Sequence, residues 1–215
     1  MLWRAGLEPQ AALAGWSASS LGGSACTCAE LVVPVFLDKR LVPSGPRPYA
    51  SAVETAAYDD AVGRLTRETT VRGLLGAACR ELVELLDATA CAISRVIGDL
   101  LVGLDEHTTS GRPLAHGHEY LISDFPLTRE VVETGQPRWV SRLDEHADEH
   151  EAELLSRLGF ESLLMVCLPA DDGCWALVEV YEERGSFDEQ RALLAARFAA
   201  RAGSLLEQLE LPRTR

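Results

Sequence analysis

Positive charge is scarce in this sequence of 215 residues. Lysine and arginine together number 20 against 33 aspartates and glutamates, which gives a formal net charge of −13, and Lys39 is the sole lysine. Nucleic-acid binding depends on clustered basic side chains that neutralise phosphates, and binding to an anionic membrane surface depends on the same charge. The composition therefore argues against a nucleic-acid or membrane-surface partner.

The sequence also lacks a long apolar run. A membrane-spanning helix needs about 20 predominantly apolar residues, and no stretch here reaches that length. Residues 1–25 contain no apolar segment suited to a secretory signal. The six cysteines do not require disulfides, because four of them lie in apolar helix or strand patterns, where a free thiol packs as a small hydrophobic group. We therefore expect a cytoplasmic, reduced protein.

The first 50 residues differ in composition from the rest. They contain a glycine pair, a serine cluster and several prolines, and their charge is near neutral, so the negative charge lies in residues 51–215. This contrast predicts a disordered extension at 1–50, followed at 51–215 by a globular domain with N- and C-terminal flanking helices. The alternative is that translation starts near Val53, which a full-length intact mass would exclude.

Two pairs of apolar segments predict two β-hairpins. Residues 162–168 and 174–181 are nearly continuous apolar runs joined by an Asp-Asp-Gly turn, and an Asp-Gly pair between such runs is a typical hairpin signal. Residues 91–97 and 100–105 form a similar pair around a Gly-Asp turn. We expect the two hairpins to join in one antiparallel sheet.

Most other segments carry apolar residues at helical spacing. The pattern predicts helices at 53–65, 71–86, 126–133, 148–158 and 188–209, and short strands at 120–122 and 138–141.

This order of elements resembles the GAF domain family, a sensory fold. The segments that carry the resemblance, over about residues 65–210, are LDATACAI at 86–93, YLISDFPLT at 120–128, LGFESLLM at 158–165 and ALVEVY at 176–181, followed by Phe187. The resemblance implies an α+β, GAF/PAS-like (profilin-like) fold, in which a six-stranded antiparallel sheet is flanked by helices on both faces.

Motifs of the ligand-binding branches of the family are missing. Cyclic-nucleotide-binding members carry an Asn-Lys pair upstream of a Phe and an Asp-Glu, and only Phe187-Asp188-Glu189 stands here. Bilin-binding members place a cysteine beside a histidine in the variable loop, but residues 107–119 hold three histidines and no cysteine, so a covalent bilin is not expected. The Gly-Val-Cys-Gly segment of the methionine-sulfoxide reductases is absent as well. The ligand and any cofactor stay unknown.

Glu179 is the most unusual residue of the last predicted strand. Alternation along that strand would place it on one face with Trp175, Leu177 and Tyr181. A carboxylate among apolar residues is costly unless it is paired, so it either meets an arginine or a helix N-terminus, or contacts a ligand. By resemblance, other segments cover the same face of the sheet. The ligand-pocket candidates are Tyr120, Asp124, Phe125, Trp139, Trp175 and Glu179.

Histidines and cysteines give weaker signals. His116 with His118, and His146 with His150, could share a metal ion, but acidic neighbours favour a solvated surface for the second pair, and we predict no metal site. No one histidine is singled out as a haem ligand. Cys167 and Cys174 flank the hairpin turn and either pack in the core or form a redox pair, which thiol titration would decide.

We therefore predict a GAF-like signalling module that senses a small molecule or binds a protein partner, without an output domain of its own. The terminal helix carries Leu194, Phe198, Leu205 and Leu209 at near-heptad steps, which is compatible with a homodimer through terminal helices. The alternative is a structural dimerisation module with no ligand, and the third reading is a thiol-redox or metal-dependent enzyme. A pocket lined by Tyr120, Trp175 and Glu179 would favour the sensor, and a filled core would favour the scaffold.

Overall fold

The structure is a computed structural model that describes residues 52–114, 119–145, 147–170 and 173–210. The predicted disordered extension at 1–50 lies outside these residues. The described elements are α1 (Ala52–Leu65), α2 (Val71–Leu85), β1 (Ala90–Ile97), β2 (Leu100–Thr108), β3 (Glu119–Leu121), η1 (Ile122–Asp124), α3 (Pro126–Thr134), β4 (Arg138–Ser141), α4 (Glu149–Leu158), β5 (Ser162–Ala170), β6 (Gly173–Glu182) and α5 (Glu189–Glu210). None of the described helices is long and apolar enough to cross a membrane.

The strands form one six-stranded sheet in the order β3-β2-β1-β6-β5-β4. Every neighbouring pair is antiparallel, and the central pair joins the two hairpins: Ala90 of β1 lies opposite Tyr181 of β6, and Ile93 lies opposite Val178. The predicted α+β fold with a shared antiparallel sheet is therefore confirmed.

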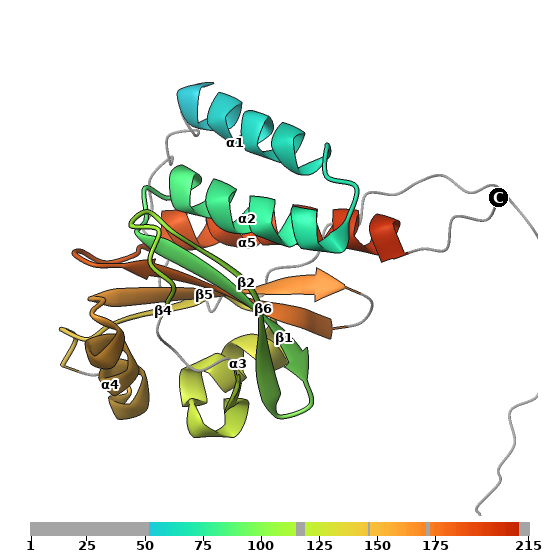
Figure 1. The fold of residues 1–215 in the computed structure, drawn as a ribbon. Helices are drawn as coiled ribbons and strands as arrows, with labels where there is room; N and C mark the ends of the chain where they lie inside the picture. Colours follow the sequence, from blue (N-terminus) through green and yellow to red (C-terminus); the bar gives the residue numbers. More distant parts are fainter. Residues whose placement is uncertain (1–51, 115–118, 146, 171–172, 211–215) are drawn as a thin grey trace, which may run out of the picture. The chain divides into compact units, whose positions relative to one another are not determined.

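Helices α1, α2 and α5 lie on one side of this sheet, and α3 and α4 lie on the other (Figure 1). Helices α2 and α5 pack directly against the strands, while α1 packs on the outside of these two helices. Because the central strands are covered on both faces, their sequences are apolar at successive positions rather than alternating. Val166 of β5 thus belongs to one core, and its neighbour Met165 belongs to the other.

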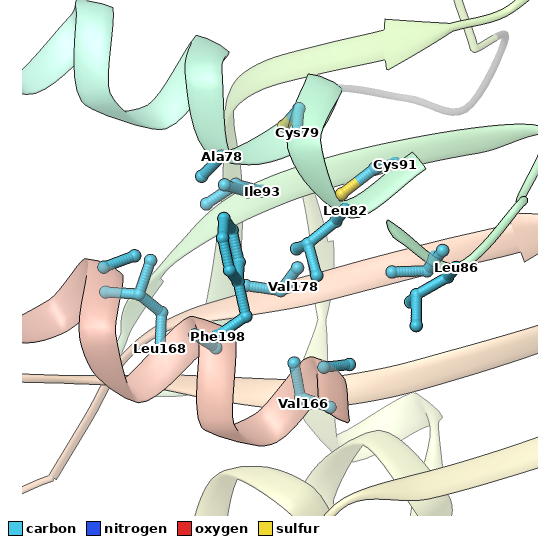
Figure 2. Close-up of a cluster of buried hydrophobic side chains, with 14 of the residues drawn as sticks. Ala78, Cys79, Leu82, Leu86, Cys91, Ile93, Val166, Leu168, Val178 and Phe198 are labelled. Carbon is cyan, nitrogen blue, oxygen red and sulfur yellow. The ribbon is translucent and has the colours of Figure 1, made fainter. Parts of the chain in front are cut away.

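The first core lies between the sheet and α1, α2 and α5. Figure 2 shows Phe198 of α5 among Ile93, Val178 and Leu168 of the strands, with the thiols of Cys79 and Cys91 nearby. The apolar stripe predicted for the terminal helix faces this core: Phe198 is buried, and Leu194, Leu205 and Leu209 are partly buried against it. Much of the stripe is therefore used within the chain.

Glycine allows α5 to come unusually close to the sheet. A Cβ atom at Gly203 would lie 2.0 Å from the backbone oxygen of Pro169 in β5. No side chain fits at that distance, so the helix and the strand are in contact through their backbones at this point.

The ends of α4 follow from local sequence. The side chain of Asp148 accepts hydrogen bonds from the backbone N–H groups of His150 and Glu151, which have no partner within the helix. Gly159 ends the helix with a φ of 84°, a left-handed conformation that glycine adopts readily. These caps fix where α4 begins and ends on the face of the sheet opposite α2 and α5.

Candidate functional site

A buried carboxylate and two tyrosines meet on the face of the sheet covered by α3 and α4. Glu179 of β6 is only 1% exposed, and its Oε1 accepts hydrogen bonds from the hydroxyls of Tyr120 (2.7 Å) and Tyr181 (3.0 Å). Tyr120 comes from the edge strand β3, so its side chain crosses β2 and β1 to reach β6. The cluster therefore connects the edge of the sheet to its centre.

Both phenols of this cluster are held in the protonated state. Burial, and then the neighbouring charge of Glu179, raises the pKa of Tyr120 and of Tyr181 well above the ordinary value of a phenol. Each tyrosine is consequently a hydrogen-bond donor to the carboxylate at any physiological pH.

Glu151 of α4 is a second buried carboxylate on this face. It is 0% exposed, and its Oε1 accepts two hydrogen bonds of 3.2 Å from Thr128, one from the backbone N–H and one from the hydroxyl. Thr128 lies in the first turn of α3, a helix that has no side-chain N-cap of its own. One oxygen of Glu151 therefore caps α3 from the neighbouring helix.

The Thr128 hydroxyl links this carboxylate to the sheet. It lies 3.3 Å from the sulfur of Met165, which is directly opposite Glu179 in the β5–β6 ladder. Burial raises the pKa of Glu151 to about 7, and the hydrogen bonds from Thr128 only partly offset this effect, while the charge of Glu179 adds to it. The two carboxylates are thus near neighbours in an apolar setting.

A surface cleft of about 510 Å³ opens beside these buried groups. It lies between the start of α3 and the outer side of α4, with Asp124 and Phe125 on one wall and Arg157 on the other. The ring of Phe125 packs edge-on against the ring of Tyr120, with 5.2 Å between centroids. Phe125 therefore stands between the cleft and the Tyr120–Glu179 pair.

The structure brings together four of the six predicted pocket residues. Tyr120 and Glu179 are hydrogen-bonded, Phe125 contacts Tyr120, and Asp124 lines the adjoining cleft. Trp139 of β4 is 40% exposed and is separated from Glu179 by the width of β5.

The predicted position of Trp175 is wrong. The register of β5 and β6 shifts after Leu168, since Leu168 pairs with Ala176 while Pro169 pairs with Cys174, and Trp175 is the extra residue of a β-bulge. It packs against the first core, with the guanidinium of Arg95 4.3 Å from its ring. The expected pocket of Tyr120, Trp175 and Glu179 is therefore not formed.

Sequence reasoning missed Glu151 and Thr128. The neighbouring glutamates Glu149 and Glu153 are exposed, so the acidic start of α4 has the character of a solvated surface. A signal was present, because Glu151 stands three and four residues before Leu154 and Leu155, on the apolar side of the helix. The prediction that Glu179 meets an arginine, a helix N-terminus or a ligand also left out its two tyrosine donors.

Thiols and histidines do not form a catalytic or metal-binding group among the described residues. No cluster of three or more histidine, cysteine or acidic side chains there could hold a metal ion, and His116, His118 and His146 lie outside them. Cys167 and Cys174 do approach each other across the hairpin. Their mutual hydrogen bond, and then burial, raises the pKa of the Cys174 thiol, which makes it a poor nucleophile.

Two other clefts are polar surface features. One of about 600 Å³ lies near Asp87, Glu182 and Arg191, and one of about 520 Å³ surrounds the ion pair of Arg64 and Glu81, whose closest N–O distance is 2.6 Å. The buried carboxylate of the second cleft, Glu81, is paired with Arg64, whereas the carboxylates under α3 and α4 accept hydrogen bonds from hydroxyl groups.

The family model described as "GAF domain" matches residues 71–206, more than half of the chain. The search of curated proteins returned no match.

Solved structures with a similar fold include several from phytochromes. A bacteriophytochrome from the photosynthetic bacterium R. palustris has a TM-score of 0.67 at 12% identity, over 76% of this chain and 40% of that one. The chromophore-binding domain of a Stigmatella aurantiaca bacteriophytochrome has a TM-score of 0.63 at 17% identity, over 76% and 63%. The phycoerythrobilin-bound GAF domain of a cyanobacterial phytochrome has a TM-score of 0.63 at 16% identity, over 75% of this chain and 98% of that one. The chain thus spans less than two thirds of the first two structures, and at these identities the likeness concerns the fold alone.

Proposed function

The chain belongs to the GAF domain family, and we propose that it senses a small molecule bound between the sheet and helices α3 and α4. The observation that supports this most is the buried Tyr120–Glu179–Tyr181 hydrogen-bond cluster, which lies behind Phe125 and next to the 510 Å³ cleft. Ligand sites are typically concave and largely apolar, with a few polar groups that fix orientation. Tyr120, Asp124, Phe125 and Glu179 are the ligand-contacting residues of this proposal.

The proposed mechanism is a shift between two populations of the domain. A ligand that enters from the cleft displaces the Phe125 ring from Tyr120 and binds more tightly to that arrangement, which increases its population. Strand β6 carries Glu179 and leads through Phe187 into α5, so the site is continuous along the chain with the terminal helix. A protein partner that contacts α5 would respond to the position of that helix. The free thiols among the described residues suit a cytoplasmic location.

Native mass spectrometry of the gently purified protein tests the proposal. We expect a retained small molecule on the wild type and a clear loss of retention on Tyr120→Phe, which removes one hydroxyl from the site. Tyr58→Phe is the matched control, because Tyr58 is also buried but lies in the first core. Its hydroxyl donates a hydrogen bond to the backbone oxygen of Arg197 in α5. Equal retention by both variants, or no retained molecule in any preparation, would contradict the proposal.

A structural dimerisation module is the second candidate, and one observation favours it. Apolar side chains pack closely around the buried carboxylates, among them Leu101, Leu155, Phe160 and Met165. In that case Glu151 and Glu179 serve to fix the packing of α3, α4 and β3. Retention of no ligand together with a stable dimer would favour this function. A thiol-redox or metal-dependent enzyme stays the third candidate.

A further inference from the structure

The second core, which lies between the sheet and helices α3 and α4, contains a carboxylate oxygen that has no hydrogen-bond partner among the described residues. Glu151 is completely buried, and both of its hydrogen bonds from Thr128 go to Oε1. Its Oε2 is equally buried and accepts no hydrogen bond. A buried polar atom of this kind costs free energy comparable to a lost hydrogen bond, so its presence calls for a specific reason.

The surroundings of this oxygen are acidic rather than basic. The groups that act electrostatically on Glu151 are Glu179 and Asp148, both of which oppose its ionisation. Among the arginines of this face, Arg138 pairs with Glu130, Arg142 donates to the backbone oxygen of Phe160, and Arg157 lines the adjoining cleft. A positive charge at this oxygen would be attracted by both Glu151 and Glu179, and the net charge of −13 would favour its approach.

The same surroundings are aromatic and apolar. Phe125, Tyr120 and Tyr181 lie around or next to the carboxylates, and Met165 contacts the Thr128 hydroxyl. A group that combines a delocalised positive charge with a flat apolar body matches both features, since cations are attracted to ring faces and N–H forks match carboxylates.

We infer that the ligand of this site carries a basic group, an amidinium or a protonated amine, that donates to Glu151 Oε2. The inference rests on the proposed function, because it names the chemical class of the sensed molecule. The apolar part of the ligand would occupy the place of the Phe125 ring and extend into the cleft beside Asp124 and Glu153.

Three probes of nearly the same shape test the charge requirement: benzamidine, benzamide and benzoate. We expect benzamidine to raise the melting temperature of the wild type and to bind in a calorimetric titration, benzamide to bind at least tenfold more weakly, and benzoate not to bind. Tighter benzamidine binding is expected as the pH rises from 6 to 8, because the carboxyl of Glu151 ionises across that range.

The Glu151→Gln variant locates the effect. Its amide keeps an oxygen for Thr128 but loses the charge, so we expect at least a tenfold loss of benzamidine affinity and no remaining pH dependence. Glu149→Gln is the matched control, since Glu149 is an exposed glutamate on the same helix and does not line the cleft. Circular dichroism verifies that both variants are folded. Equal affinity for the three probes, failure of benzamidine to bind, or unchanged affinity in Glu151→Gln would overturn the inference.

The native mass spectrum separates this inference from the proposed function. A retained molecule that is neutral or acidic would overturn the basic-ligand inference and leave the sensor function standing. Retention of a basic molecule that is lost in Glu151→Gln would support both. Absence of any retained molecule would count against the sensor function itself.

Discussion

Glu151 combines two roles in one side chain, because one oxygen caps α3 and the other is buried without a hydrogen bond. Its neighbour on the sheet, Glu179, is supplied with hydroxyl donors by two tyrosines. Burial raises the pKa of Glu151, so the ionisation of this side chain works against folding.

Replacing Glu151 should change how stability depends on pH. Its pKa is about 7 in the folded protein against 4.5 for an ordinary glutamate. A raised folded-state pKa favours the folded state fully below about pH 4.5, and this contribution is lost as the pH rises through 7. The loss is on the order of 3 kcal/mol for a shift of this size. We expect urea unfolding of Glu151→Gln to vary less between pH 5 and pH 8 than that of the wild type, and parallel curves would contradict this.

Gly203, the one glycine of α5, should be difficult to replace. In Gly203→Ala the new Cβ would lie 2.0 Å from the Pro169 backbone oxygen, so the helix must move away from the sheet. We expect a loss of about 1–3 kcal/mol in the free energy of unfolding. Gly63→Ala in α1 is the control, because nothing lies within 4 Å of its Cβ position, and it should be neutral or stabilising by up to about 1 kcal/mol. Chemical denaturation measures both, and equal effects would show that the close approach is unimportant.

The cap of α4 should influence the site that this helix covers. Asp148→Ala removes the acceptor for two backbone N–H groups, one of which belongs to Glu151. We expect about 1 kcal/mol of destabilisation and faster hydrogen exchange confined to the first turns of α4 and α3. Asp144→Ala, four residues earlier in the preceding loop, is the comparison. Unchanged exchange in α3 would mean that the two helices are not coupled through Glu151.

The helices and strands were predictable from the sequence to within a few residues, because each begins or ends at a recognisable signal. Pro126 and Gly159 are examples, and the β-hairpins followed from apolar runs. The site was less predictable for two physical reasons. A bulge at Trp175 interrupts the alternation that assigns faces, and hydrogen bonds such as that of Tyr120 to Glu179 join residues 59 positions apart, which local patterns do not reveal.

The formation of a homodimer stays a prediction, and a substitution at one exposed residue can test it. Leu193 lies on the outer side of α5 and is 48% exposed, whereas the predicted stripe on the same helix faces the core. A homodimer through the terminal helices would cover Leu193, so we expect a dimeric mass by light scattering for the wild type and a monomeric mass for Leu193→Asp. Leu143→Asp is the control, because Leu143 is 65% exposed in the loop after β4. A monomeric wild type would contradict the homodimer.

The backbone contact at Gly203 has a geometric consequence for α5. It forms a fixed point on a helix of 22 residues, about 33 Å long, and Glu189 at the start of the helix lies roughly 21 Å away. A tilt of about 5° around that fulcrum would swing the start of α5 by roughly 2 Å, by simple leverage along a rise of about 1.5 Å per residue. A small change in sheet curvature would therefore produce a larger displacement at the exposed start of α5.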